Sequence, residues 1–123
     1  MARILKLSTP KTRARTLTVA EAIPEFLKGY EDGSPHTLRS FRADLQRFEE
    51  AFGERPVGQI TGPDIQAYLE ALKSRRAGSD GPVAPQTYNR HFGTLRRFFG
   101  WLEGQEELER SPMDRLERRK VGE

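Results

Sequence analysis

Side chains that can bind phosphate gather in two stretches of this sequence, residues 39–47 and residues 87–97. The segment TYNRHFGTLRRFFGWL, residues 87–102, holds three arginines and no acid, although the chain has 18 Asp and Glu in all. Arginine pairs with phosphate oxygens or with the guanine edge, and Asn, Gln, Ser and Thr can bond to bases or phosphates. A carboxylate among them would repel an anion. The side chains that this chemistry selects as candidate contacts are Arg39, Ser40, Arg47, Thr87, Asn89, Arg90, Thr94 and Arg97.

Residues for metal binding or catalysis are scarce by comparison. The chain has no cysteine, which excludes disulfides and thiolate metal sites. Its two histidines, His36 and His91, lie far apart in the sequence, and neither has a second ligand at motif spacing. We therefore expect no metal, no cofactor and no catalytic residue in this chain.

The distribution of charge separates the first 16 residues from the rest. They contain five basic residues and no acid, whereas the other 107 residues hold 16 basic and 18 acidic residues. A charge run of one sign without hydrophobic periodicity predicts a flexible basic arm over residues 1–16. No apolar run is long enough for a signal peptide or a membrane span, so the expected location is the cytoplasm.

The spacing of apolar residues predicts an all-α domain. A content of 35% hydrophobic and 32% charged residues suits a small, well-solvated helical domain better than a sheet protein. From Leu38 to Phe52, for example, apolar side chains recur at intervals of three and four, which is the stripe of an amphipathic helix. Four helices and a short fifth one are expected near residues 18–30, 34–52, 61–76, 85–103 and 112–118.

The predicted helices 34–52 and 85–103 have outer faces of the same kind. Opposite each apolar stripe lie arginines, short hydroxyl or amide side chains and one very small residue, Ala43 or Gly93. A small residue there would let the helix backbone approach a groove closely. Basic residues on a single helix are usually solvated surface, but two such faces favour a shared surface for an anionic partner. Composition does not distinguish DNA, RNA and an acidic protein as that partner.

Three segments carry motifs whose order and spacing are shared with a known family. The residues that carry the motifs are Ser34, Thr37, Phe41, Asp44, Leu45 and Phe48, then Thr87, Asn89, Arg90, Leu95, Arg96, Phe98, Phe99 and Trp101, and finally Ser111, Pro112, Leu116 and Arg118–Lys120. Together they resemble the N-terminal core-binding, SAM-like domain of tyrosine recombinases of the phage-integrase and Xer type. The resemblance covers about residues 17–120. Ala84 departs from it, because the family often has a Ser or Thr cap there.

The resemblance implies a four-helix SAM-like orthogonal bundle with a short fifth C-terminal helix. It implies that the second and fourth helices face the major groove of double-stranded DNA, and that residues 118–123 begin a linker after a DNA-binding domain at residues 17–117. The catalytic domain of the same parent protein, with its tyrosine nucleophile, would follow that linker, so this chain alone should not be an enzyme. The implied partners are DNA, that catalytic domain and other recombinase protomers assembled on DNA.

Two other classes of function remain open. Small helical bundles of this kind also serve as protein–protein interaction modules, although the acid-free helix face argues against that function. An RNA-binding helical domain would usually expose aromatic side chains for base stacking, whereas most aromatic residues here fall on predicted core stripes.

Overall fold

A computed structural model describes residues 17–74 and 81–120 of the chain, and its regular elements are helices. In chain order these are α1 (Val19–Lys28), α2 (Pro35–Phe52), the 3-10 turn η2 (Val57–Gln59), α3 (Gly62–Glu70) and α4 (Pro85–Gly104). Within those residues the only β-type pairing consists of two isolated bridges. The all-α prediction is confirmed. No helix in the same residues has the length and apolar character needed to cross a membrane.

Side-chain caps begin the first three helices. Thr18 and Glu21 exchange hydrogen bonds across the first turn of α1, and Thr61 and Asp64 do the same for α3. The hydroxyl of Ser34 accepts a backbone hydrogen bond in the first turn of α2, directly before a proline at the first helical position. Each cap satisfies backbone N–H groups that have no partner inside the helix.

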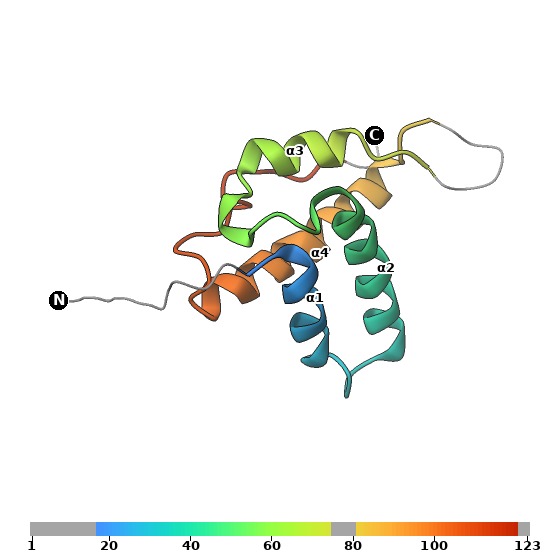
Figure 1. The fold of residues 1–123 in the computed structure, drawn as a ribbon. Helices are drawn as coiled ribbons and strands as arrows, with labels where there is room; N and C mark the ends of the chain where they lie inside the picture. Colours follow the sequence, from blue (N-terminus) through green and yellow to red (C-terminus); the bar gives the residue numbers. More distant parts are fainter. Residues whose placement is uncertain (1–16, 75–80, 121–123) are drawn as a thin grey trace.

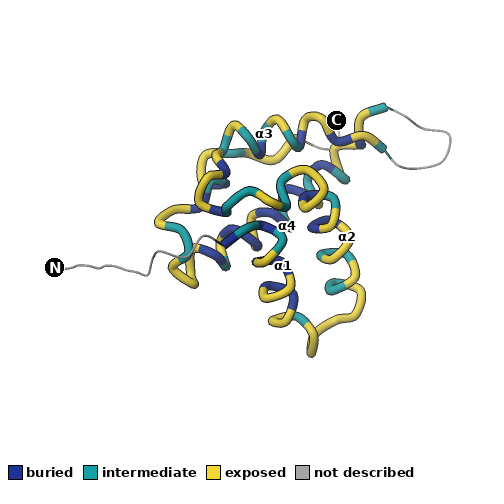
Figure 2. Tube along the Cα trace, in the orientation of Figure 1, coloured by how far each residue is buried: buried dark blue, intermediate teal, exposed yellow. Residues whose placement is uncertain are grey.

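Helix α4 is the centre of the fold. It contacts each of the other three helices. In the view of Figure 1 it runs behind the α1–α2 pair, and α3 lies above it. Buried residues occur along all four helices, on the sides that face one another (Figure 2). Because α4 packs against several neighbours, its buried arc is wider than a single stripe, and the adjacent residues Phe98 and Phe99 are both fully buried. The largest fully buried side chains are Tyr88, Phe26, Phe48, Phe92, Phe98, Phe99, Leu45, Ile65, Leu69, Leu102 and Val19.

The start of α1 is tied to the segment between α2 and α3 by backbone hydrogen bonds. Val19 N–H donates to the carbonyl of Arg55 at 3.0 Å, and Val57 N–H donates to the carbonyl of Leu17 at 2.8 Å. Leu17, Val19 and Val57 are all buried, so the hydrogen bonds lie beside apolar packing. The folded unit therefore includes the residues just before α1.

Helix α3 is shorter than predicted, ending at Glu70 instead of residue 76. Beyond it, the backbone pairs with the chain that enters α4: Val83 N–H donates to the carbonyl of Leu72 at 3.2 Å, and Ser74 N–H donates to Gly81 at 2.9 Å. Leu72 and Val83 are buried by this pairing. These contacts draw residues 72–74 out of the helical path, while residues 75 and 76 lie outside the described part of the chain.

The predicted fifth helix at 112–118 is also wrong. The hydroxyl of Ser111 accepts a hydrogen bond from Met113 N–H at 3.1 Å, but only a turn follows. Its backbone bonds, such as Leu116 N–H to the Met113 carbonyl at 3.0 Å, span three residues. Met113 is buried, and a Cβ on Gly62 would lie 3.1 Å from the carbonyl oxygen of Pro112. The turn packs closely on the start of α3, and the chain then extends.

Candidate nucleic-acid interface

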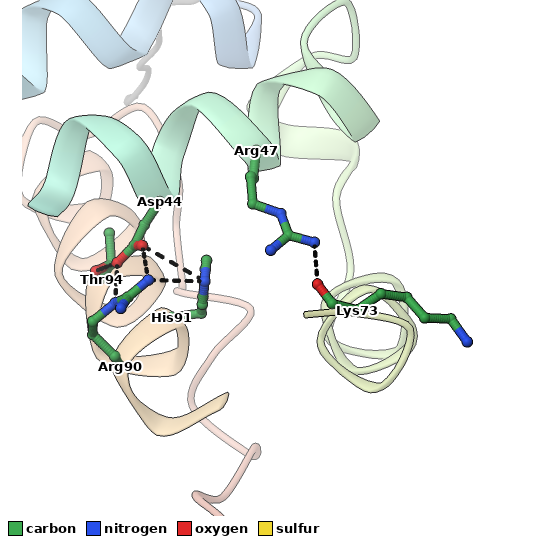
Figure 3. Close-up of polar contacts among 6 residues, drawn as sticks. All are labelled: Asp44, Arg47, Lys73, Arg90, His91 and Thr94. Carbon is green, nitrogen blue, oxygen red and sulfur yellow. Dashed lines mark hydrogen bonds and ion pairs between the residues drawn. The ribbon is translucent and has the colours of Figure 1, made fainter. Parts of the chain in front are cut away.

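A buried carboxylate joins α2 to α4 at the centre of the candidate interface. Asp44 on α2 is 3% exposed, and it accepts hydrogen bonds from Arg90 on α4, at 2.7 Å from Nη2 and 3.3 Å from Nε. The hydroxyl of Thr94, one turn further along α4, donates a third hydrogen bond at 2.8 Å. Figure 3 shows these side chains meeting between the two helices. The negative charge of Asp44 is thus paired within the fold.

His91 lies buried beside this ion pair. Its Nε2 is 3.6 Å from a carboxylate oxygen of Asp44 and 3.3 Å from Nη2 of Arg90. Burial lowers the pKa of His91 below its ordinary value of 6.5, and Arg90 and Arg47 lower it further, while Asp44 acts in the opposite direction. The imidazole is therefore neutral at pH 7, and its Nε2 can accept a hydrogen bond from Arg90. Its role is structural.

A hollow of about 590 Å³ lies over α2 and α4 beside this network, and we call it the arginine hollow. Four arginines line it and no carboxylate does. With low-dielectric protein walls on several sides, guanidinium groups gathered in this way concentrate positive potential. Such a site suits an anion such as a phosphate. The lining residues are Ser40, Phe41, Asn89, Arg90, Gly93, Thr94, Arg96, Arg97 and Arg118.

A second hollow of about 570 Å³ lies next to it, toward the start of α4. Arg47 and Thr87 line it from α2 and α4, and Asp44, already paired with Arg90, is its only acid. The guanidinium of Arg47 points away from Asp44 and donates to the carbonyl of Lys73 at 3.0 Å (Figure 3). Arg47 therefore links α2 to the chain after α3 while it lines the hollow.

The structure brings most of the predicted contact residues together. Five of them border the arginine hollow, and three border the second hollow, with Arg90 lining both. Arg39 is exposed on α2 and lines neither. Four have partners within the fold that the sequence did not show: Arg90 and Thr94 bond to Asp44. Arg47 bonds to the carbonyl of Lys73, and Asn89 bonds to the backbone of Arg119. Within the described residues, no group of three or more His, Asp or Glu could hold a metal ion.

Residues 23–106 match the family model of the phage integrase N-terminal SAM-like domain. This chain belongs to that family. The match covers all four helices apart from the first turn of α1, so it includes the α2–α4 face just described. The resemblance inferred from the motifs is confirmed.

Relatives of this SAM-like domain include two longer proteins. A tyrosine recombinase of Thermosipho africanus is 24% identical over 103 residues, which cover 84% of this chain and 36% of that protein. A tyrosine recombinase XerC of Roseiflexus castenholzii is 29% identical over 107 residues, covering 82% and 32%. The chain thus spans about a third of the length of these relatives.

A solved structure shares the fold of the SAM-like domain. The crystal structure of the N-terminal domain of a phage integrase/site-specific recombinase from Haloarcula marismortui superposes with a TM-score of 0.67 at 23% identity. The alignment covers 86% of this chain and 100% of that one.

Sequence reasoning about this SAM-like domain made Arg96 only a weaker candidate, because it points sideways from the predicted helix face, and missed two further residues of the interface, Arg118 and Asp44. Arg96 and Arg118 line the arginine hollow, and Asp44 bonds to Arg90, which lines it as well. A signal for Asp44 was present, because it is the only acid between Pro35 and Arg47 and still lies at the edge of the apolar stripe. A lone carboxylate at such a boundary often has a buried partner of opposite charge.

Proposed function

We propose that this chain is the DNA-binding N-terminal domain of a site-specific tyrosine recombinase or integrase, and that it clamps duplex DNA through α2 and α4. The observation that carries the proposal is the arginine hollow, which lies on those helices and is lined by four arginines without a carboxylate. The phosphate backbone of duplex DNA carries the charge that such a surface attracts. Hydroxyl and amide groups beside the arginines add contacts to phosphates or base edges.

The candidate residues divide into two roles under this proposal. Arg97 and Arg39 are exposed and contact DNA directly, with Ser40, Arg47 and Thr87 beside them. Arg90 and Thr94 hold Asp44, and because the Arg90 side chain is 53% exposed, it can still reach a phosphate while it neutralises the acid. Asn89 acts through the segment after the C-terminal turn, because its amide bonds to the backbone of Arg119.

The domain boundaries and partners follow from the same proposal. Residues 17–117 are assigned to the DNA-binding domain, and residues 118–123 to the start of a linker to the catalytic domain of the parent protein. The basic arm assigned to residues 1–16 and the last three residues of the linker lie outside the part of the chain that the structure describes. In the cytoplasm, the assembled partners are that domain, duplex DNA and further recombinase protomers.

The chain alone neither cuts nor joins DNA under this proposal. Tyr88 is buried, and Tyr30 and Tyr68 pack against the core, so none of the three tyrosines is presented as a nucleophile. Incubation with supercoiled plasmid should leave its topology unchanged and give no covalent protein–DNA adduct. An adduct that disappears on replacing one of these tyrosines by Phe would contradict the proposal.

A matched pair of charge reversals tests the DNA surface. Arg39→Glu with Arg97→Glu changes the α2–α4 face, whereas Arg110→Glu with Arg115→Glu makes the same change in net charge at exposed arginines near the C-terminal turn. Arg90 is left intact, because a carboxylate there would face Asp44 and disturb the fold. The first variant should bind a duplex oligonucleotide at least about tenfold more weakly at low salt and with a smaller salt slope. The second should bind nearly as tightly as the unmodified chain.

Fluorescence anisotropy with a labelled duplex measures both variants, and circular dichroism verifies that their helix content is unchanged. Equal binding by the two variants would show that the α2–α4 face is not the DNA surface. Competition with single-stranded RNA or with polyglutamate separates the alternatives, since preference for either over duplex DNA would favour an RNA-binding or protein-binding module instead.

A further inference from the structure

The extended chain after the C-terminal turn is docked against α4 by one side-chain amide. Nδ2 of Asn89 donates to the carbonyl of Arg119 at 2.8 Å, and Arg119 N–H donates to Oδ1 of Asn89 at 2.8 Å. Both polar groups of the amide and both backbone groups of Arg119 are thereby used. This pairing resembles that of neighbouring β-strands, and it fixes the position of the segment along α4.

Two arginines of the docked segment lie over aromatic rings of α4. The guanidinium carbon of Arg119 is 4.1 Å from the ring centre of Tyr88, and that of Arg118 is 5.0 Å from the ring centre of Phe92. Tyr88 and Phe92 are each 1% exposed. Cation–π contacts of this kind hold a guanidinium in place without neutralising its charge, so both arginines keep a positive charge for a partner.

Gly93 makes room for one of these arginines. A Cβ at this position would lie 3.1 Å from Nη2 of Arg118, closer than ordinary contact allows. The sequence suggested that the small residue lets DNA approach the helix, but the structure places the Arg118 side chain there. Arg118 also lines the arginine hollow, together with Arg97 from α4.

We propose that Asn89 is a positioning residue: it docks the C-terminal segment on α4, so that Arg118 completes the arginine hollow as a binding site for a DNA phosphate. The proposal rests on the proposed function, because it names the group that the hollow binds. The start of the linker is then part of the DNA-binding surface, and Asn89 acts on DNA only through it. A base-reading Asn89 would leave its amide open to DNA, whereas here both ends of the amide are occupied.

Docking can be tested without DNA. In the full chain, the backbone amide of Arg119 should be protected from hydrogen exchange, as measured by NMR, and Asn89→Ala should remove that protection. Gln86→Ala, one turn earlier on α4 at an exposed position, is the matched control and should leave it unchanged. Equal protection of Arg119 in the unmodified chain and in Asn89→Ala would overturn the docking role.

The link to phosphate is tested with a double-mutant cycle. Asn89→Ala and Arg118→Ala should each weaken binding to a labelled duplex by about threefold at low salt, the size of one phosphate contact. The double variant should be no weaker than Arg118→Ala alone, because Asn89 acts through Arg118. Multiplied losses in the double variant would instead show that Asn89 contacts DNA directly and would overturn the proposal.

The two proposals fail in different ways. If the unmodified chain does not bind duplex DNA, the proposed function and the phosphate assignment fall together, and the exchange experiment alone decides the docking. If the unmodified chain binds DNA and Asn89→Ala binds equally well, the DNA-binding function stands and this inference is wrong.

Discussion

Replacing Asp44 by Ala tests whether the buried carboxylate holds α2 and α4 together. The change removes two hydrogen bonds from Arg90, one from Thr94 and the nearby contact to His91. Thr94 is 2% exposed, so its hydroxyl would be left without its acceptor in a dry environment. Arg90 would lose its partner but not its access to water, because its side chain is 53% exposed.

The expected cost follows from these differences in exposure. An unsatisfied buried hydroxyl costs about 1–3 kcal/mol, while a guanidinium that can rehydrate loses only the value of a surface ion pair, about 0–1 kcal/mol. Removal of one partner from a fully buried pair would cost about 3–5 kcal/mol. We expect Asp44→Ala to lower the free energy of unfolding by only about 2 kcal/mol, because the guanidinium of Arg90 stays accessible to water.

Urea unfolding followed by circular dichroism measures this loss, with Arg97→Ala as the control. Arg97 is an exposed arginine on the same face, and its removal should change stability by less than about 0.5 kcal/mol. Thr94→Val tests the same network from α4, and its loss should not add fully to that of Asp44→Ala. The reasoning is refuted if Asp44→Ala costs no more than Arg97→Ala, or if the losses at Asp44 and Thr94 are additive.

Two further predictions concern α4. The pKa of His91 is lowered in the folded chain, so the unfolded chain binds a proton at a pH where the folded chain does not, and stability should fall as the pH drops below about 6.5. His91→Gln should flatten this fall between about pH 7.5 and 5.5, as measured by urea midpoints. An unchanged pH dependence in this variant would contradict the prediction. Helix α4 begins after Ala84 without a side-chain cap. Ala84→Ser should therefore raise the free energy of unfolding by about 0.5–1 kcal/mol, as measured by urea unfolding. A neutral or destabilising effect would mean that the serine hydroxyl makes no cap.

Much of the fold was predictable because its determinants are local. Apolar spacing and the caps Thr18, Ser34 and Thr61 mark where three helices begin, and these signals lie within a few residues of the element that they start. The end of α3 and the absence of a fifth helix were not predictable in this way. Both depend on contacts between segments distant in sequence, Leu72 with Val83 and the turn after Ser111 with the start of α3, and helix periodicity carries no information on such contacts.

The candidate site was predictable as a surface but not as a network. Helix geometry alone assigns Arg90 and Arg97 to the polar side of one helix. It does not show that Asp44 on another helix reaches Arg90, or that Arg118 lies over Gly93. The same residue types therefore suggested direct DNA contacts for Asn89 and Thr94, whose side chains have partners within the protein.

The tie between the start of α1 and the segment before α3 determines where this module could be cut for transfer into another protein. The family match begins at residue 23 and ends at residue 106, yet Leu17, Val19 and Met113 are buried outside those limits. A chimaera joined at residues 23 and 106 would lose the cap of α1, expose the pockets that these side chains fill and discard the partner of Asn89. Junctions placed before Leu17 and after Lys120 would transplant the module with its core closed and its C-terminal segment still docked on α4.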